Sequence, residues 1–438
     1  MAPPSLREAL VFWLKLGCIG FGGPAGQIAL MHHELVERRR WISERRFLHA
    51  LNYCMLLPGP EAQQLATYLG WLLHRTAGGI AAGVLFVLPS LVLLIALAWL
   101  YMAYGQTPLL AGLFYGIKPA VTAIVAHAAW RIGRRTLHNA ALWAIAIGAF
   151  IALFVFNLPF PAIVACAALL GLLGGRLWPE RFSAPPPPSL THPSAAAAFI
   201  DDDTPPPPHA RFQAGRLAGI VFVGVLLWAL PMALLILLFG GQHLLTQMGW
   251  FFTKAALLTF GGAYAVLPYV YQGAVAHFAW LSAPQMIDGL ALGETTPGPL
   301  IMVVTFVAFV GAWNHAPFGP EATAAAGVLA ALLVTWFTFL PSFVFILAGG
   351  PLVERTHRDL KFTAPLTAIT AAVVGVIVNL AAFFGYHVFW PNGAASGFDN
   401  LAAGIALAAA VALFRFKTNV MLVIATCALL GLATRFLP

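Results

Sequence analysis

The feature that most constrains this sequence is a set of four landmarks that occurs twice, at a constant offset of 239 residues (Lys15 to Lys254, Phe21 to Phe260). Each copy contains a lysine, a Phe-Gly-Gly, a Trp-x-Ser and a Pro-Gly-Pro. The first copy consists of Lys15, Phe21-Gly22-Gly23, Trp41 to Ser43 and Pro58-Gly59-Pro60. The second copy consists of Lys254, Phe260-Gly261-Gly262, Trp280 to Ser282 and Pro297-Gly298-Pro299. One shared register indicates a duplicated unit, and each unit carries two breaks inside otherwise apolar sequence.

The composition decides the class of protein. Hydrophobic residues make up 61% of the chain and charged residues only 9%, whereas a soluble domain carries about 25% charged residues. Apolar stretches recur at lengths that cross a bilayer, which takes roughly 20 residues as a helix. The short alternating strands of a membrane β-barrel are not evident. We therefore expect an all-α polytopic membrane protein, and no cleaved signal peptide, because the first apolar stretch opens the repeat itself.

Charge and cysteine usage exclude several other functions. The net charge of +8 does not indicate a nucleic-acid partner, because most Lys and Arg residues lie in short loops, where they set membrane orientation. The four cysteines are scattered singly, without a Cys-x-x-Cys pair, so disulfide, zinc and iron–sulfur sites have little support. We expect no metal, no cofactor and no nucleic acid. No paired-carboxylate or nucleophile–base arrangement marks a catalytic centre, so we expect no enzyme and no catalytic residue.

The duplication and a change of composition divide the chain into four expected parts. Residues 1–182 form an N-terminal membrane repeat, and residues 241–438 form a C-terminal repeat. Residues 183–215 form a Pro-rich cytoplasmic linker with Pro185–Pro188 and Asp201–Asp203; we expect a segment of this composition to bury nothing and to be disordered and semi-extended. Residues 216–240 form a connecting transmembrane helix without a counterpart in the first repeat.

A further shared marker locates an insertion in the second repeat. Leu88-Pro89-Ser90 corresponds to Leu340-Pro341-Ser342 at an offset of 252 residues rather than 239. We place the extra residues in the polar loop around Asn314–Glu321.

The distribution of basic residues predicts the orientation of the repeats. If each broken stretch is a re-entrant hairpin, the arginines of 38–46 and of 131–135 lie inside, as the positive-inside bias favours. The loops 263–279 and 314–322 then lie outside, and they contain no Lys or Arg. This model makes the two repeats inverted, with broken helices and a site at the membrane midplane. Parallel repeats are the alternative.

The four helix breaks are the expected substrate site. Backbone N–H groups exposed at membrane depth are tolerated only where protein or a polar cavity meets them. The N-termini of half-helices carry partial positive charge, and glycine lets an anion approach the main chain. We expect the breaks to meet at a pseudo-symmetric centre that binds an anion. The alternative is that each break is a packing kink. The substrate-binding residues in this hypothesis are Phe21, Gly22, Gly23, Pro58, Gly59, Pro60, Phe260, Gly261, Gly262, Pro297, Gly298 and Pro299.

Polar side chains near the breaks complete the expected site. Lys15 and Lys254 would balance the charge of the anion, because an intramembrane lysine is costly and functional by default; snorkelling to the interface is the alternative. Glu61 and Glu294 are the expected proton-coupling residues, although Glu61 could simply cap a helix. Neutral hydrogen bonds to an oxyanion would come from Gln64, Thr295 and Thr296. Asp288 precedes Glu294 by six residues, and Lys118 is a third embedded lysine, which we expect at the interface.

The sequence resembles the chromate ion transporter family, in its long, two-domain bacterial form. The motifs that carry the resemblance are Phe21-Gly-Gly-Pro24, Arg39-Arg40-Trp41, Leu57-Pro-Gly-Pro-Glu61, Phe86-Val-Leu-Pro-Ser90, Thr259-Phe-Gly-Gly262 and Glu294-Thr-Thr-Pro-Gly-Pro-Leu-Ile-Met302. They cover nearly the whole chain except the linker. The two copies differ at one point: the first Phe-Gly-Gly is followed by Pro24-Ala25, and the second by Ala263-Tyr264. This difference argues against strict two-fold symmetry of the site.

The resemblance implies a multi-pass bacterial inner-membrane protein that expels chromate, driven by the proton gradient, and confers chromate resistance. The implied partners are chromate, sulfate as an isosteric competitor, protons as the coupling ion, and lipid; a homodimer is allowed but not required. Two other functions fit the same scaffold. One is an importer or exchanger of sulfate or another oxyanion, and the other is a passive anion channel.

Overall fold

The computed structural model describes residues 4–21, 23–182, 198–202, 204–205, 207–260, 262–355, 363–391, 393 and 397–436. Regular structure in these ranges is helical, apart from one β-bridge between Ile42 and Ile200. This confirms the all-α prediction. The first repeat contains α1 (Leu6–Ile19), α2 (Gly23–His32), the π-helical η1 (His33–Arg38), α3 (Glu44–Leu56), α4 (Glu61–Tyr104), α5 (Pro108–Thr136), α6 (Ala140–Phe154), α7 (Phe160–Leu177) and α8 (Pro179–Phe182).

The connecting segment has no counterpart in the first repeat, whereas the helices of the second repeat follow the order of those in the first. The connection contains η2 (Pro208–Ala210) and α9 (Ala214–Phe239). The second repeat contains α10 (Leu244–Leu258), α11 (Ala263–Tyr271), the π-helical η3 (Gln272–His277), α12 (Ala283–Thr295), η4 (Leu300–Met302), α13 (Val303–His315), η5 (Pro320–Ala322), α14 (Thr323–Arg355), α15 (Thr363–Phe389), α16 (Asn400–Phe414) and α17 (Val420–Phe436).

The backbone repeats as faithfully as the sequence motifs do. Both α2 and α11 run on into a six-residue π-helix, η1 and η3. Each π-helix is followed by a non-glycine residue with positive φ, Arg40 at 52° and Ala279 at 51°. Ser43 and Ser282 then cap α3 and α12 with their side chains. These features keep the 239-residue offset, so the duplicated sequence encodes a duplicated path of the main chain.

In the first repeat both broken stretches return to the face from which they start. The guanidinium of Arg39, just after η1, lies 2.8 Å from the carboxylate of Glu8 near the start of α1. The chain reverses inside α4 at His74 and Arg75, whose φ is 58°, and the ring of His74 contacts the Pro4 carbonyl oxygen at 2.9 Å. These contacts agree with the expected re-entrant hairpins.

The hairpins of the second repeat open at the other end of the molecule. Asn314, near the end of α13, donates to the Trp280 carbonyl oxygen before α12 at 3.1 Å. From that end α14 runs 33 residues, or about 50 Å at the α-helical rise, until Glu354 meets Arg46 at the start of α3. The two sets of hairpins thus open at opposite ends of one long helix, an arrangement compatible with inverted repeats. The inversion itself, and which membrane face each end meets, stay predictions.

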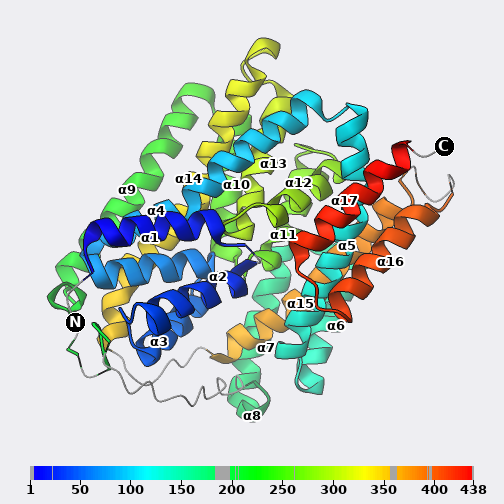
Figure 1. The fold of residues 1–438 in the computed structure, drawn as a ribbon. Coiled ribbons are helices and arrows are strands. Elements are labelled where there is room, and N and C mark those ends of the chain that lie inside the picture. Colours follow the sequence, from blue (N-terminus) through cyan, green and yellow to red (C-terminus); the bar gives the residue numbers. More distant parts are fainter. Residues whose placement is uncertain are drawn as a thin grey trace.

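The repeats exchange helices. α5 of the first repeat packs against α16 and α17 of the second, while α15 of the second packs against α6 and α7 of the first. Figure 1 shows this exchange, with α17 (red) beside α5 (cyan). Small residues permit the close approach: a Cβ at Gly116 would overlap the backbone of α17, and one at Gly375 would overlap that of α6. Such contacts are typical of membrane helix pairs.

Length and polarity place several helices across the membrane. Within the described ranges, six helices are long and apolar enough to span it, namely those at 61–104, 108–136, 160–177, 214–239, 320–354 and 364–389. α9 presents large apolar side chains outward, such as Phe222 at 67% and Leu237 at 83% exposure. Since hydrocarbon rather than water surrounds such a face, the exposure fits lipid contact. The prediction of a multi-pass membrane protein is confirmed.

Part of the expected linker is docked rather than free. Residues 183–197, 203 and 206 lie outside the described residues. The stretch that follows meets the hairpin end of the first repeat, where the Ile200 N–H donates to the Trp41 carbonyl oxygen at 3.0 Å. Ile200 and Ala210 are 3% and 1% exposed. The expectation that this segment buries nothing was therefore wrong for these residues, because two apolar side chains among the prolines and aspartates suffice to anchor it.

Candidate functional site

The four helix breaks meet in pairs, and each pair joins the two repeats. The Gly59 N–H donates to the Thr259 carbonyl oxygen at 2.7 Å, and the Gly298 N–H donates to the Gly20 carbonyl oxygen at 3.0 Å. Gly20 and Thr259 are equivalent positions, as are Gly59 and Gly298. Reciprocal contacts between equivalent residues are what a two-fold relation produces. The Phe-Gly-Gly break of each repeat is thus tied to the Pro-Gly-Pro break of the other.

The two Pro-Gly-Pro breaks are closed by side chains. Gly59 and Gly298 have φ of 131° and 102°, values that favour glycine. A Cβ at Gly59 would lie 2.6 Å from the amide nitrogen of Gln64, and one at Gly298 would lie 2.7 Å from the Cβ of Ser90. Pro60 and Pro297 to Pro299 are buried, and Pro58 is half-buried. These residues form the junction between the repeats and leave no room for an ion at the glycines themselves.

The two Phe-Gly-Gly breaks are open. Gly23 and Gly262 have φ of 71° and 97°, and a Cβ at either would meet no described atom within 4 Å. They begin α2 and α11, two half-helices. Phe21 is 39% exposed and Phe260 is half-buried. Gly22 and Gly261 lie outside the described residues. Gly23 is half-buried, whereas Gly262 and the first residues of α11 are buried. Of the expected backbone site, these two positions thus have free space beside the glycine, and only the N-terminus of α2 is partly exposed.

Buried glutamines surround the junction. Gln27, which sequence reasoning missed, is fully buried and donates to the carbonyl oxygens of Gly20 at 2.9 Å and Gly298 at 2.5 Å. Gln64 donates to the Pro58 carbonyl oxygen at 2.8 Å. The Oε1 atoms of both side chains are buried and lack a hydrogen-bond partner among the described residues. Gln64 therefore offers an acceptor rather than the free N–H donor that we expected for an oxyanion.

The hydroxyl groups of the two threonines expected in the site donate to carbonyl oxygens of their own helix. Thr295 donates its hydroxyl to the Leu292 carbonyl oxygen at 2.9 Å, and Thr296 donates to that of Gly293 at 3.1 Å. Such bonds to the preceding helical turn are common for Ser and Thr. In this conformation the threonines hold the end of α12 in place and offer only lone pairs to a neighbour.

Glu294 lies in a cluster that joins α11, α12 and α5. It is half-buried and accepts a hydrogen bond from the Tyr264 hydroxyl. Arg131 of α5 lies close enough to act electrostatically on both residues. Sequence reasoning placed Arg131 in a cytoplasmic loop and noted Tyr264 only as a departure from the first copy. Glu61, half-buried at the start of α4, makes no ion pair among the described residues.

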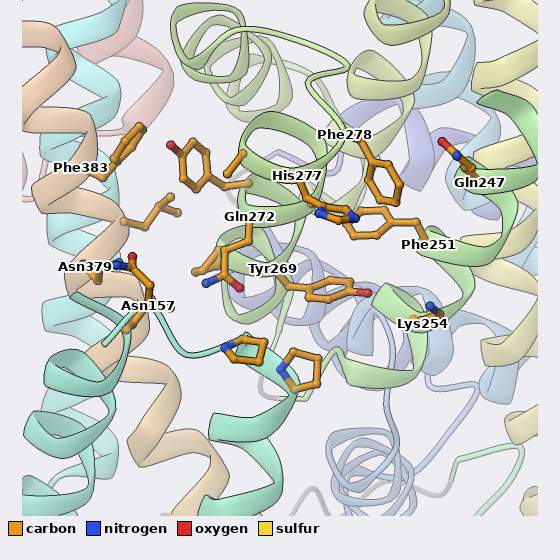
Figure 2. Close-up of a pocket in the computed structure, with 18 of the residues that line it drawn as sticks. Asn157, Gln247, Phe251, Lys254, Tyr269, Gln272, His277, Phe278, Asn379 and Phe383 are labelled. Carbon is orange, nitrogen blue, oxygen red and sulfur yellow. The ribbon is translucent and has the colours of Figure 1, made fainter. Parts of the chain in front are cut away.

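Lys15 and Lys254 make no hydrogen bond or ion pair with the junction residues described above. Both are exposed, and neither makes an ion pair with a described carboxylate. Lys254 lines a cavity of about 1480 Å³ between α10, α11, η3, α15 and the α6–α7 loop. Figure 2 shows Lys254, Gln247 and Phe251 on one side of this cavity, opposite Asn157, Asn379 and Phe383. Lys254 is the one Lys or Arg among the described lining residues, and no Asp or Glu lines the cavity there.

A second pair of charges is buried between α5 and α12. The Lys118 ammonium lies 3.4 Å from Oδ2 of Asp288, and the Tyr101 hydroxyl of α4 donates to the same oxygen at 2.8 Å. Asp288 is 2% exposed. Lys118, which we expected at the interface, instead forms an ion pair that joins the two repeats.

These observations define a class of protein. Duplicated units with interrupted helices, interlocked around a junction between them, are an architecture typical of membrane transporters. A family model described as "Chromate transporter" matches residues 7–172 and 246–432, which fall within the two expected repeats. The chain belongs to the chromate transporter family, which confirms the resemblance seen in the sequence.

Curated relatives agree with this assignment. The "Chromate transport protein" of Pseudomonas aeruginosa is 33% identical over 441 residues, which cover 98% of this chain and 92% of that protein. The "Chromate transport protein" of Cupriavidus metallidurans is 30% identical over 430 residues, 98% of this chain and 93% of that protein. An uncharacterized transporter of Bacillus subtilis, YwrB, aligns over 149 residues, or 34% of this chain. No solved structure matches this chain.

Proposed function

We propose that this protein moves chromate out of the cell across the inner membrane in exchange for protons and so confers chromate resistance. Membership of the chromate transporter family supports the substrate. The observation that carries the mechanism is the reciprocal junction of the four breaks, next to which Gly23 and Gly262 have free space at the start of two half-helices.

The half-helix N-termini supply the attraction for a doubly negative ion. Each N-terminus carries unpaired N–H groups and a partial positive charge of about half an elementary charge. Glycine at this position lets an oxyanion reach those groups without a side chain in the way. Lys15 and Lys254 stand on the preceding helices and balance charge along the approach; Lys254 does so from the wall of the cavity. The closed Pro-Gly-Pro breaks hold the two N-termini in place.

Glu61 and Glu294 carry the protons in this proposal. In an exchange, chromate and protons occupy the site in alternate states: the two carboxyl groups take up protons at the outer face after chromate has left, and release them at the inner face before chromate binds. An ionised carboxylate and a dianion repel each other strongly where the surroundings are apolar, so Lys15, Lys254 and the half-helix N-termini are needed to offset that repulsion while chromate is bound. The Tyr264 hydroxyl holds Glu294 on the α12 side of the junction, and the charge of Arg131 acts on it from α5, so this residue is set to exchange a proton while the junction keeps its shape.

Everted membrane vesicles test the proposal, since their lumen corresponds to the outside of the cell. A lumen that is acidic relative to the medium should drive chromate uptake, and a protonophore should abolish it. Sulfate should compete. Uptake that survives the protonophore and does not saturate would identify a passive channel instead. Uptake confined to right-side-out vesicles would identify an importer.

Two variant sets assign roles within the site. The double variant Lys15→Ala, Lys254→Ala should lose proton-driven chromate uptake at normal abundance, whereas unchanged uptake would remove the lysines from the mechanism. Glu294→Gln should separate the two halves of the reaction, because a permanently neutral residue can still admit chromate but cannot carry a proton. A matched control is Gln213→Ala, an exposed position just before α9.

A further inference from the structure

Two clusters of the same chemistry lie along the packed faces of α5 and α12. In one, Asp288 of α12 is flanked by Lys118 of α5 and by the Tyr101 hydroxyl. In the other, Glu294 of α12 accepts a hydrogen bond from the Tyr264 hydroxyl, and the charge of Arg131 of α5 acts on it without an ion-pair contact. Each cluster combines a carboxyl group, a basic residue and a phenol. We call this pair of clusters the α5–α12 seam.

The seam runs from one end of the molecule toward the junction. Asp288 belongs to the first half of α12, which starts beside Trp280 and Asn314 at the hairpin end of the second repeat. Glu294 belongs to the end of α12, next to the Pro-Gly-Pro break. Six residues separate them along the chain, or about 9 Å at the α-helical rise. Asp288 therefore stands between the predicted outer face and Glu294.

A third cluster with this chemistry shows what a purely structural version looks like. Glu354 accepts from the Tyr68 hydroxyl at one oxygen (2.6 Å) and from Arg46 at the other (2.7 Å). Both of its oxygens are satisfied. At Asp288 both partners contact Oδ2, and Oδ1 is buried without a partner among the described residues. A buried ionised oxygen without a partner is costly, so the negative charge of Asp288 is poorly compensated where that of Glu354 is fully compensated.

The surroundings of Asp288 contain few other charges. α12 packs against α4, α5, α13, α15 and α17. The groups that act on the Asp288 carboxylate are Lys118 from α5 and Tyr101 from α4, and no titratable group of the described parts of α13, α15 or α17 adds to them. The side chain of Lys118 is 29% exposed, against 9% for Arg46. The basic partner of Asp288 thus keeps a path to polar surroundings when the carboxylate is neutralised.

We propose that Asp288 takes up the coupling proton on the outer side and passes it along the α5–α12 seam to Glu294. A hydronium ion from the outer water gives its proton to the Asp288 carboxylate, which forms an O–H bond and releases water. The Lys118 ammonium, now without its partner, turns to its polar surroundings, and the charge of Arg131 acts on the negative charge that remains at Glu294. The proton then moves through intervening water to Glu294, and Asp288 regains its charge and its ion pair. This inference rests on the proposed proton-coupled transport.

The test removes the pair as a unit, so that no unpaired buried charge remains. The double variant Asp288→Asn, Lys118→Gln is compared with Glu354→Gln, Arg46→Gln, a matched pair outside the seam. Two readouts use purified protein in proteoliposomes. The first is exchange of radiolabelled chromate at equal pH on both sides. The second is chromate accumulation driven by a pH gradient, where one coupled proton and one pH unit sustain about tenfold accumulation, since a pH unit corresponds to 1.36 kcal/mol.

The seam variant should keep exchange within about twofold of wild type, below the 1.4 kcal/mol that makes a tenfold change, and should lose the gradient-driven accumulation. The Glu354 and Arg46 variant should keep both. Normal accumulation by the seam variant overturns the inference, and so does loss of exchange at wild-type abundance, because Asp288 would then serve substrate binding or folding. If wild type exchanges chromate but never accumulates it, the proposed proton coupling fails instead.

Asp288→Glu decides the matter if the double variant is scarce. It keeps an acidic group and should retain gradient-driven accumulation, with a pH profile displaced from that of wild type. An unchanged pH profile would show that this position does not carry the transported proton.

Discussion

The hairpin ends of the two repeats share a backbone and differ in chemistry. In both, a π-helix is followed by a residue with positive φ and then by a tryptophan. The backbone N–H of Trp41 donates to the Leu35 carbonyl oxygen, and that of Trp280 donates to the Ala274 carbonyl oxygen, each at 2.8 Å. Around η1 lie ion pairs that join Arg39 to Glu8 and Glu34. Around η3 lie aromatic rings and amides, and η3 itself has no Lys, Arg, Asp or Glu.

One pair of equivalent residues makes the difference plain. The Arg39 guanidinium lies 4.9 Å from the ring centre of Trp41. At the equivalent place in the second repeat, the Phe278 ring stacks on Trp280 with centroids 4.5 Å apart and an angle of 6° between the planes. A planar cation in one repeat and a planar apolar ring in the other thus pack against the equivalent tryptophan. The duplicated fold tolerates either, and the predicted orientation, with the basic end inside, would account for the choice.

The largest expected effect tests whether the two ends face opposite sides. Glu37 and Ala276 are exposed equivalent positions. In a cysteine-free background, Ala276→Cys should react with a membrane-impermeant maleimide in intact cells, and Glu37→Cys should react only in everted vesicles. Because the label either reaches a site or does not, the result is all or none. Labelling of both from the same side would contradict the inverted arrangement.

The next largest effect contrasts the closed and open breaks. Gly59→Ala and Gly298→Ala meet both a positive φ and occupied space, so the folded protein should be lost. Gly23→Ala and Gly262→Ala meet only the backbone penalty, about 1–2 kcal/mol, and should fold. Abundance in the membrane and thermal unfolding in detergent measure this. Equal behaviour of the four variants would show that the junction is not a tight contact.

A smaller effect concerns the charged end alone, where the segment around Ile200 docks. Ile200→Asp should release this segment, since burying an Ile side chain is worth about 1.5–3 kcal/mol. Limited proteolysis should then cut near Ile200 faster, with little change in the unfolding temperature of the membrane helices. Gln213→Ala serves as the control. An unchanged cleavage rate would mean that backbone bonds alone hold the segment.

The smallest effect concerns Arg39 itself. Arg39→Phe copies the second repeat and should cost at most about 1 kcal/mol, because half-exposed ion pairs are weak; Arg39→Ala should cost more, since it also removes the stacking on Trp41. Partial burial alone would raise the pKa of Glu34, but hydrogen bonds and charges from Arg38 and Arg39 lower it below 4.5 on balance. That contribution is present above pH 4.5 and is lost as the pH falls through the lowered value. Acid unfolding of Arg39→Phe should therefore depend less on pH than that of wild type.

Much of the fold is readable from the sequence because its causes are local. Glycine and proline interrupt helices within a few residues of themselves, so the breaks at Gly23, Gly59, Gly262 and Gly298 lie where the motifs predict, each with positive φ. Long apolar runs form the long helices for an equally local reason: each apolar side chain lowers the free energy of the helix in a bilayer, whatever its distant partners are. The offset of 239 residues then carries the architecture of one repeat over to the other.

The partners of the polar residues were decided only by the tertiary structure. Gly59 pairs with Thr259, Glu294 with Tyr264 and Asp288 with Lys118, and Ile200 docks beside Trp41. No local pattern marks these pairs, and counting arginines placed Arg131 in a loop although it lies near Glu294. The physical reason is range. Helix formation and interruption depend on neighbours along the chain, whereas a hydrogen bond or ion pair between distant segments depends on how all the helices pack at once.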